Sequence, residues 1–169
     1  AAIVISKTSE NAGLIKYNSK TYPDGVKYTI IEGGGHINHP SEVSYNRELY
    51  SFKMHGKKLL KEAKSILPSF LSNFYNSLNI SMKDIDLIVP HQTSKLGFRM
   101  LKSLNNGNNQ NIVNQLQKYG NCIAASIPIA LVSSIQDQKL NEGETCFLVG
   151  TAAGITVSGM LFKYSKIWV

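Results

Sequence analysis

The spacing of hydrophobic residues changes several times along the chain, and these changes predict strands that alternate with helices. Short apolar runs bounded by turn residues predict the strands, and the turn Pro23-Asp24-Gly25 separates two of them. The predicted strands lie at residues 1–6, 13–17, 26–31, 85–89 and, as a pair, between 147 and 168. An alternation of this kind favours an α/β fold.

Three stretches carry helical patterns. Apolar residues at steps of three and four predict an amphipathic helix over residues 54–78, which Pro68 should kink or divide. A second helix follows residue 94, and residues 124–130 predict a helix that is apolar on nearly all sides and therefore buried. Ser81 to Asp84 predicts a capped turn before the strand at 85–89. The segments 32–40, with three consecutive glycines, and 105–111, rich in asparagine, predict loops.

Composition limits the function classes. At 169 residues, with no internal repeat or linker, we expect one domain spanning residues 1–169. The formal charge of +7 is spread over scattered lysines and arginines without a nucleic-acid-binding motif, so it favours an acidic partner or an ordinary solvated surface. Cys122 and Cys146 form neither a disulfide framework nor a metal site, and we expect buried free thiols. His36 and His39 lack a third ligand, so no metal is predicted.

Targeting signals are also absent from the pattern. No apolar run approaches the roughly 18 residues of a membrane span, and nothing resembles a signal peptide, so we expect a soluble cytoplasmic protein. The chain opens on Ala1-Ala2-Ile3 without an initiator methionine. This opening is typical of a sequence that begins within a strand, so the sequence need not be a complete protein.

Two polar residues stand where chemistry is expected. His91 directly follows the strand that ends at Pro90, and ligands of open α/β sheets bind outside the carboxyl ends of the strands. Asn121 lies 30 positions further on, in a tight turn with Gly120 that opens the apolar helix. On these residues alone, His91 is either a functional group or a hydrogen-bonded histidine of the fold.

The contexts of both residues carry a family resemblance. The strand ending in Pro90-His91-Gln92, the segment YGN-x-x-x-ASIPIAL from Tyr119 and the motif G-x-A-A-G-I-T from Gly150 occur in this order, downstream of MHGK at Met54. Together they resemble the carboxyl-terminal half of a ketoacyl-acyl carrier protein synthase III, in the thiolase-like superfamily. The resemblance implies a thiolase-like half with a mixed five-stranded sheet and helices on both faces, and an amino-terminal cysteine-bearing half that is absent here.

The resemblance also implies an activity. It implies decarboxylative Claisen condensation of an acyl thioester with a carrier-bound malonyl or β-ketoacyl group, in fatty-acid or polyketide-type biosynthesis. In this reaction His91 and Asn121 would donate hydrogen bonds to the enolate oxygen of the malonyl thioester. The backbone N–H of Ala153 would stabilise the other oxyanion, that of the acyl-enzyme intermediate.

Other residues are assigned by the resemblance to the substrate. Gly56 and Lys57 begin the helix beside the pantetheine tunnel, and Lys57 replaces an asparagine common in the family. Thr93 and Ser94 replace alanine and asparagine, and Thr151 stands where many synthases III have phenylalanine. These departures favour a divergent member with an unusual acyl substrate. The resemblance implies no permanently bound cofactor, with coenzyme A or phosphopantetheine thioesters as substrates.

The expected partners follow from the same resemblance. A basic helix face of Lys95, Arg99 and Lys102 would dock acyl carrier protein, or would be an ordinary solvated face. The nucleophilic cysteine would come from another segment or chain, because Cys122 directly follows Asn121 and would project differently. A homodimer of the complete subunit is implied, and this half alone should expose a large apolar patch.

Two other functions stay open at this stage. The chain could be a non-catalytic subunit that stabilises a cysteine-bearing partner. Alternatively, it could serve acyl transfer to an alcohol or amine, with His91 as general base.

Overall fold

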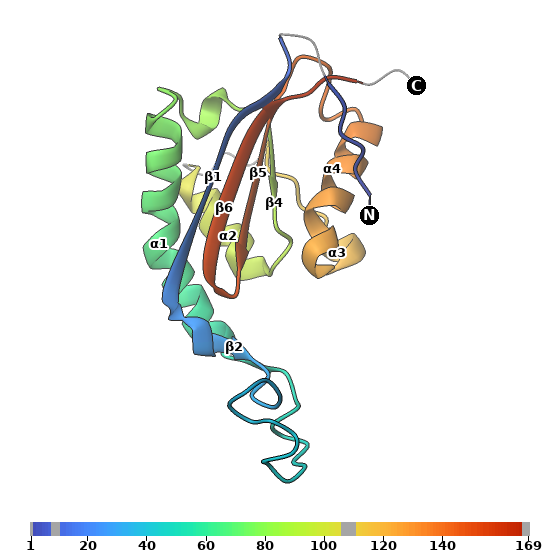
Figure 1. Cartoon of the computed structure of the whole chain (residues 1–169). Coiled ribbons are helices and arrows are strands. Elements are labelled where there is room, and N and C mark those ends of the chain that lie inside the picture. The colour runs from blue at the N-terminus through green and yellow to red at the C-terminus, as the bar shows by residue number, and fades with distance from the viewer. Residues whose placement is uncertain (1, 8–10, 106–110, 167–169) are drawn as a thin grey trace.

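We describe a computed structural model of the 169-residue chain, which defines residues 2–7, 11–105 and 111–166. The central sheet has the order β1-β6-β5-β4 and combines antiparallel and parallel pairs (Figure 1). Its strands are β1 (Gly13–Gly25), β4 (Leu87–Pro90), β5 (Thr145–Ala152) and β6 (Gly154–Lys163). Short strands β2 (Thr29–Ile30) and β3 (Lys53–Met54) form a separate pair.

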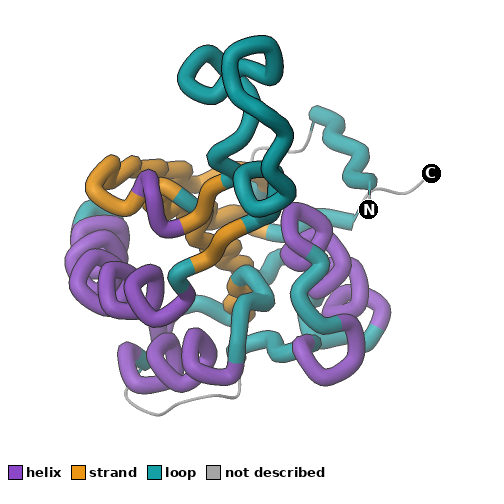
Figure 2. The backbone as a smooth tube through the Cα atoms, turned by 90° about the horizontal axis from the view of Figure 1, so that it is seen from below, coloured by secondary structure: helices purple, strands orange, loops and turns teal. Residues whose placement is uncertain are grey.

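Helices cover both faces of the sheet, as predicted (Figures 1 and 2). The helices α1 and α2 pack on one face and α4 packs on the other. The α-helices are α1 (Gly56–Asn76), α2 (Lys95–Leu104), α3 (Leu116–Tyr119) and α4 (Ser126–Gln136). Three 3₁₀ turns complete the elements: η1 (Val26–Tyr28), η2 (Met82–Asp84) and η3 (Ile123–Ala125).

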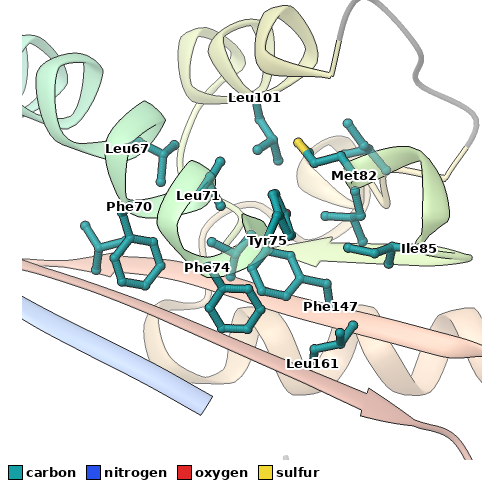
Figure 3. Close-up of a cluster of buried hydrophobic side chains, with 14 of the residues drawn as sticks. Leu67, Phe70, Leu71, Phe74, Tyr75, Met82, Ile85, Leu101, Phe147 and Leu161 are labelled. Carbon is teal, nitrogen blue, oxygen red and sulfur yellow. The ribbon is translucent and has the colours of Figure 1, made fainter. Parts of the chain in front are cut away.

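The alternation of side chains in β4 and β5 divides the core between these two layers. Ile88 and Phe147 are 0% exposed and contact the residues of α1 and α2, whereas Val89 and Cys146 are equally buried on the α4 side. Successive residues of a strand point to opposite faces, so two short strands supply both cores. Along α1, the buried residues recur at steps of one and three and form a single stripe that faces the sheet (Figure 3).

Several expected elements differ from the structure. Residues 2–7 form no strand, because they pair with no other described segment, and Val4 and Ile5 are more than 80% exposed. The predicted turn at Pro23-Asp24-Gly25 is instead the irregular end of β1, where the register shifts before Gly25 pairs with Gly154. Of the predicted strand 26–31, only Thr29–Ile30 is extended.

The sheet also differs from its expected strand count. It has four strands in the described residues rather than five, and a single parallel bridge between Ile88 and Ile112 occupies the next position beyond β4. The two hydrogen bonds Ile88 N–H to Asn111 O (2.7 Å) and Val113 N–H to Ile88 O (2.9 Å) hold that segment against β4. One residue of pairing is too short to count as a strand.

Two helices correct the sequence-based expectations. Pro68 lies inside α1 without dividing it. The segment 124–130 starts in a 3₁₀ turn and continues in α4, and it is not buried all round, because Ala124 is exposed and Ile127 is only half-buried. The flanking apolar residues Ile123 and Val132 are 77% and 41% exposed. Their exposure agrees with the expectation that this half leaves apolar surface uncovered.

The remaining predictions can be placed briefly. The glycine-rich segment 32–40 is a loop, and Ser81 caps η2 through a reciprocal capping box with Asp84. Cys146 is buried as expected, but Cys122 is only half-buried. Most of the predicted polar loop 105–111 lies outside the described residues, because residues 106–110 are not described. Trp168, the end of the predicted last strand, also lies outside the described residues. None of the described helices has the length and apolar character needed to cross a membrane.

Candidate active site

The turn that carries His91 leaves the carboxyl end of β4. Pairing of Pro90 with Val149 in parallel β4 and β5 brings this end beside the last residues of β5, and the His91 N–H donates to Val149 O at 2.8 Å. Parallel strands have their carboxyl ends at the same end of the sheet, so the end of β4 and the β5–β6 turn lie at one end of the sheet (Figure 1). The predicted position of His91 is therefore the one that the structure has.

Gln92 fixes this turn from within. It is 2% exposed, and its Nε2 donates to Pro90 O at 2.8 Å and to Val113 O at 3.4 Å. Its Oε1 accepts a hydrogen bond from Gln115 N–H at 2.8 Å. Gln92 thus links the His91 turn to the segment that leads towards Asn121. Sequence reasoning gave Gln92 no role, although a polar side chain between an apolar strand and a helix was a usable signal.

His91 borders a small cavity of about 50 Å³ between the sheet end and the α1–α2 pair. Thr93, Thr151 and Met100 line it together with His91, and its polar surface is small. The half-buried position lowers the pKa of His91 by desolvation, because the uncharged imidazole is the better-tolerated form there. Neither ring nitrogen has a hydrogen-bond partner among the described residues.

Gly150 brings the start of α4 close to His91. A Cβ added at Gly150 would lie 3.6 Å from His91 Cβ and 3.3 Å from Ile127 Cδ1. Ile127 belongs to the first turn of α4, which Asn121 precedes. The absence of a side chain at Gly150 therefore lets β4, β5 and α4 converge at one point.

Asn121 is oriented by η3 and by the first residue of α4. Its Oδ1 accepts from Ile123 N–H at 2.8 Å and from Ser126 Oγ at 3.4 Å. With the oxygen thus engaged, Nδ2 is the free end of the amide and has no hydrogen-bond partner within the described residues. Asn121 is exposed, so this donor is open to approach.

The turn between β5 and β6 supplies the third predicted group. Ala152 and Ala153 are exposed there, and Gly154 adopts φ +133°, a conformation that side chains disfavour. Thr151 reaches the His91 cavity from the same strand. These two exposed residues therefore lie at the same sheet end as His91.

Gly56 and Lys57 lie at the start of α1 and are exposed. His55 N–H donates to Tyr28 O at 2.8 Å, and Gly25 pairs with Gly154. These contacts connect the start of α1 to the edge where the β5–β6 turn lies. Neither Gly56 nor Lys57 lines the His91 cavity, and a Cβ at Gly56 would meet no atom within 4 Å.

The residues after His91 separate into two roles. Thr93 lines the cavity, whereas Ser94 is the N-cap of α2 and its Oγ accepts from Gly97 N–H at 3.1 Å. Lys95 and Arg99 are exposed and Lys102 is half-buried; they are four and three positions apart, which places them on one side of α2. No group of three or more potential metal ligands occurs among the described residues.

The fold matches solved thiolase-like enzymes. The β-ketoacyl-[acyl carrier protein] synthase III of Thermus thermophilus superposes with a TM-score of 0.82 at 21% identity, over 96% of this chain and 50% of that one. OleA of Xanthomonas campestris superposes with a TM-score of 0.69 at 18% identity, over 87% of this chain and 38% of that one. The chain therefore has the thiolase-like α/β fold.

Sequence comparison then gives the family. Residues 76–164 match the model of the 3-oxoacyl-[acyl-carrier-protein] synthase III C-terminal region. The β-ketoacyl-[acyl-carrier-protein] synthase III of Clostridium perfringens is 33% identical over 168 residues, and that of Staphylococcus epidermidis 28% identical over 168 residues. These alignments cover 96% and 98% of this chain but 50% and 48% of the relatives. The chain belongs to the synthase III family and spans about half the length of the curated relatives it matches, as the motifs predicted.

Proposed function

We propose that this chain is the condensing half of a ketoacyl-acyl carrier protein synthase III-like acyltransferase. It would supply His91 and Asn121 to an active site completed by a cysteine from another segment or chain. The observation that carries this proposal is the half-buried His91 at the end of the sheet where the β5–β6 turn also lies, a position that lowers the pKa of the imidazole. The reaction would be decarboxylative condensation of a cysteine-bound acyl group with a carrier-bound malonyl or β-ketoacyl group.

His91 suits the role of a neutral donor. Burial lowers its pKa, so near pH 7 the imidazole is uncharged and still carries one N–H. Loss of carbon dioxide from a malonyl thioester places negative charge on the thioester oxygen, and a preorganised donor at that oxygen stabilises the transition state. A hydrogen-bond partner at either ring nitrogen would compete for that donor, and the described residues offer none.

Asn121 is proposed as the second donor. Two hydrogen bonds hold its Oδ1, so the Nδ2 hydrogens rather than the carbonyl face outwards. This orientation suits a donor to an enolate oxygen and not a partner for a protonated base. The exposed backbone at Ala153 is proposed as the donor to the tetrahedral oxyanion of the acyl-cysteine intermediate.

The substrates and partners are proposed from the same arrangement. The acyl and extender groups would arrive as thioesters of coenzyme A or of carrier-bound phosphopantetheine, passing Gly56 and Lys57. The basic side of α2, formed by Lys95, Arg99 and Lys102, would attract an acidic carrier protein. The complete subunit would act as a homodimer in the cytoplasm.

The test separates condensation from acylation. The chain, in its complete subunit or together with its cysteine-bearing half, is loaded with acyl-coenzyme A and then given malonyl-carrier protein. We expect Asn121→Ala and His91→Ala each to lower the condensation rate about a hundredfold to a thousandfold while the cysteine is still acylated. Asn18→Ala, at an exposed position of β1, is the matched control.

The alternatives have distinct outcomes. Acyl transfer to an alcohol or amine predicts that Asn121→Ala keeps its activity while His91→Ala loses it. A non-catalytic subunit predicts that neither variant changes the rate. Intact-mass spectrometry also locates the acyl group, and an acyl increment on Cys122 would refute the assignment of the nucleophile to another segment.

A further inference from the structure

Ser126, the first residue of α4, is a buried polar residue that bonds to the turn carrying Asn121. It is 3% exposed, and buried polar side chains in folded proteins are nearly always hydrogen-bonded. Its Oγ accepts a hydrogen bond from Cys122 N–H at 2.9 Å and donates one to Asn121 Oδ1 at 3.4 Å. One hydroxyl therefore joins the peptide group that follows Asn121 to the side chain of Asn121 itself.

The backbone of this turn needs such support. Gly120 has a φ of +68°, and Ile123 has a φ of +52°, a region that is unfavourable for a β-branched residue. The Ile123 side chain is 77% exposed, so packing inside this chain does little to hold it in place. A disfavoured backbone conformation persists only where the surrounding contacts fix it. The hydrogen bonds that Ser126 and Asn121 make across the turn are contacts of that kind.

The order of donors and acceptors determines which end of the Asn121 amide faces outwards. The oxygen of Ser126 accepts from Cys122 N–H, and its single hydrogen is directed at Asn121 Oδ1. Ile123 N–H donates to the same Oδ1 at 2.8 Å. A flipped amide would set Nδ2, which is a donor, against the Ile123 N–H, and the Ser126 hydrogen would lose its acceptor. The hydroxyl of Ser126 therefore favours the orientation in which Nδ2 faces outwards.

We infer that Ser126 is a positioning residue of the condensing site and acts on the reaction through the side chain of Asn121. It holds Nδ2 where the enolate oxygen of the malonyl thioester forms, and it touches neither the substrate nor the reacting atoms. The inference rests on the proposed function, which gives Asn121 its role as a donor. A donor held in place stabilises the transition state without reorienting, so loosening it should slow the chemical step and leave substrate binding unchanged.

A double-mutant cycle tests whether Ser126 acts through Asn121. The complete subunit, or the chain together with its cysteine-bearing half, is loaded with acyl-coenzyme A and then given malonyl-carrier protein. We expect Ser126→Ala to lower the kcat of condensation about tenfold, with the acylation rate and the KM for malonyl-carrier protein unchanged. Added to Asn121→Ala, the same substitution should cost less than about twofold more, because no amide is left to position.

Ser134→Ala is the matched control. Ser134 is 0% exposed and lies further along the same helix, where its Oγ donates to Ala130 O at 2.8 Å. The control therefore makes the same chemical change at a buried, hydrogen-bonded serine that makes no bond to the Asn121 turn. We expect it to condense at the rate of the parent protein.

Three results would overturn the inference. The first is condensation by Ser126→Ala at the parent rate. The second is an equal loss in the parent and Asn121→Ala backgrounds, and the third is a parallel loss of acylation; both would mean that Ser126 supports the fold alone. A failure of the proposed function looks different, because Asn121→Ala would then itself condense at the parent rate.

Discussion

Replacing Gln92 by methionine should destabilise the turn that carries His91. The substitution keeps the side-chain volume but removes the donors to Pro90 O and Val113 O and the acceptor for Gln115 N–H. Gln92 is 2% exposed, so water does not replace these partners freely. Each buried group left without a partner costs about 1–3 kcal/mol. The bond to Val113 O is the longest of the three, at 3.4 Å, and contributes least, so we expect the free energy of unfolding to fall by about 3 kcal/mol in total.

Urea denaturation measures this loss, and the midpoint should fall while the slope stays unchanged because the same surface is exposed on unfolding. For a chain of this size the melting temperature should drop by about 6–12 °C. Gln117→Met, at an exposed position of α3, is the control and should change little. The reasoning is refuted if the two variants have the same stability. Condensation should also slow, because a displacement of about 1 Å at a reacting group can cost about a hundredfold in rate.

Three further predictions use other parts of the molecule. Gly159→Ala should cost about 1–3 kcal/mol of stability, because the new Cβ would lie 2.9 Å from two ring atoms of fully buried Phe147; a thermal melt equal to that of the parent protein would contradict this. The lowered pKa of His91 makes the folded state bind protons less readily than the unfolded state, so stability should be lost as the pH falls below about 6.5. Between about pH 7 and pH 5 the urea midpoint of His91→Gln should therefore fall less than that of the parent protein, and an equal fall would exclude the effect. Burial raises the pKa of Cys146 to about 12, so iodoacetamide should label half-buried Cys122 first and Cys146 only on unfolding, as peptide mass spectrometry would reveal.

The elements that the sequence predicted well are those whose pattern reflects burial inside this chain. The period of α1 and the apolar run of β4 persist because each packs on the sheet described here. Residues 2–7 failed as a strand although their pattern is as apolar, since a strand needs a hydrogen-bonded neighbour and no described segment provides one. The exposed side of α4 has the same explanation: its hydrophobicity predicts a partner surface but not where that surface comes from.

The candidate site divides in a similar way. The position of His91 at the sheet edge followed from the strand ending at Pro90, because sequence and topology agree there. The distant partners of Gln92 could not be predicted, since they are a carbonyl and an N–H group more than 20 positions further along the chain. The close approach of elements at Gly150 could not be predicted either, because it depends on side chains from two different elements that both lie next to the position a Cβ of residue 150 would occupy.

The pairing of β1 with β6 has a consequence for the synthesis of this chain. Lys20 pairs with Val157, 137 positions later, and Gly13 pairs with Lys163. At a translation rate of about 5–20 residues per second, β1 waits about 7–30 seconds for its partner strand to leave the ribosome. During that interval Leu14 and Tyr17, which stay more than half exposed even in the folded chain, are open to other nascent chains. The β1 edge of the sheet, opposite β4, is therefore among the last parts of the described fold to form.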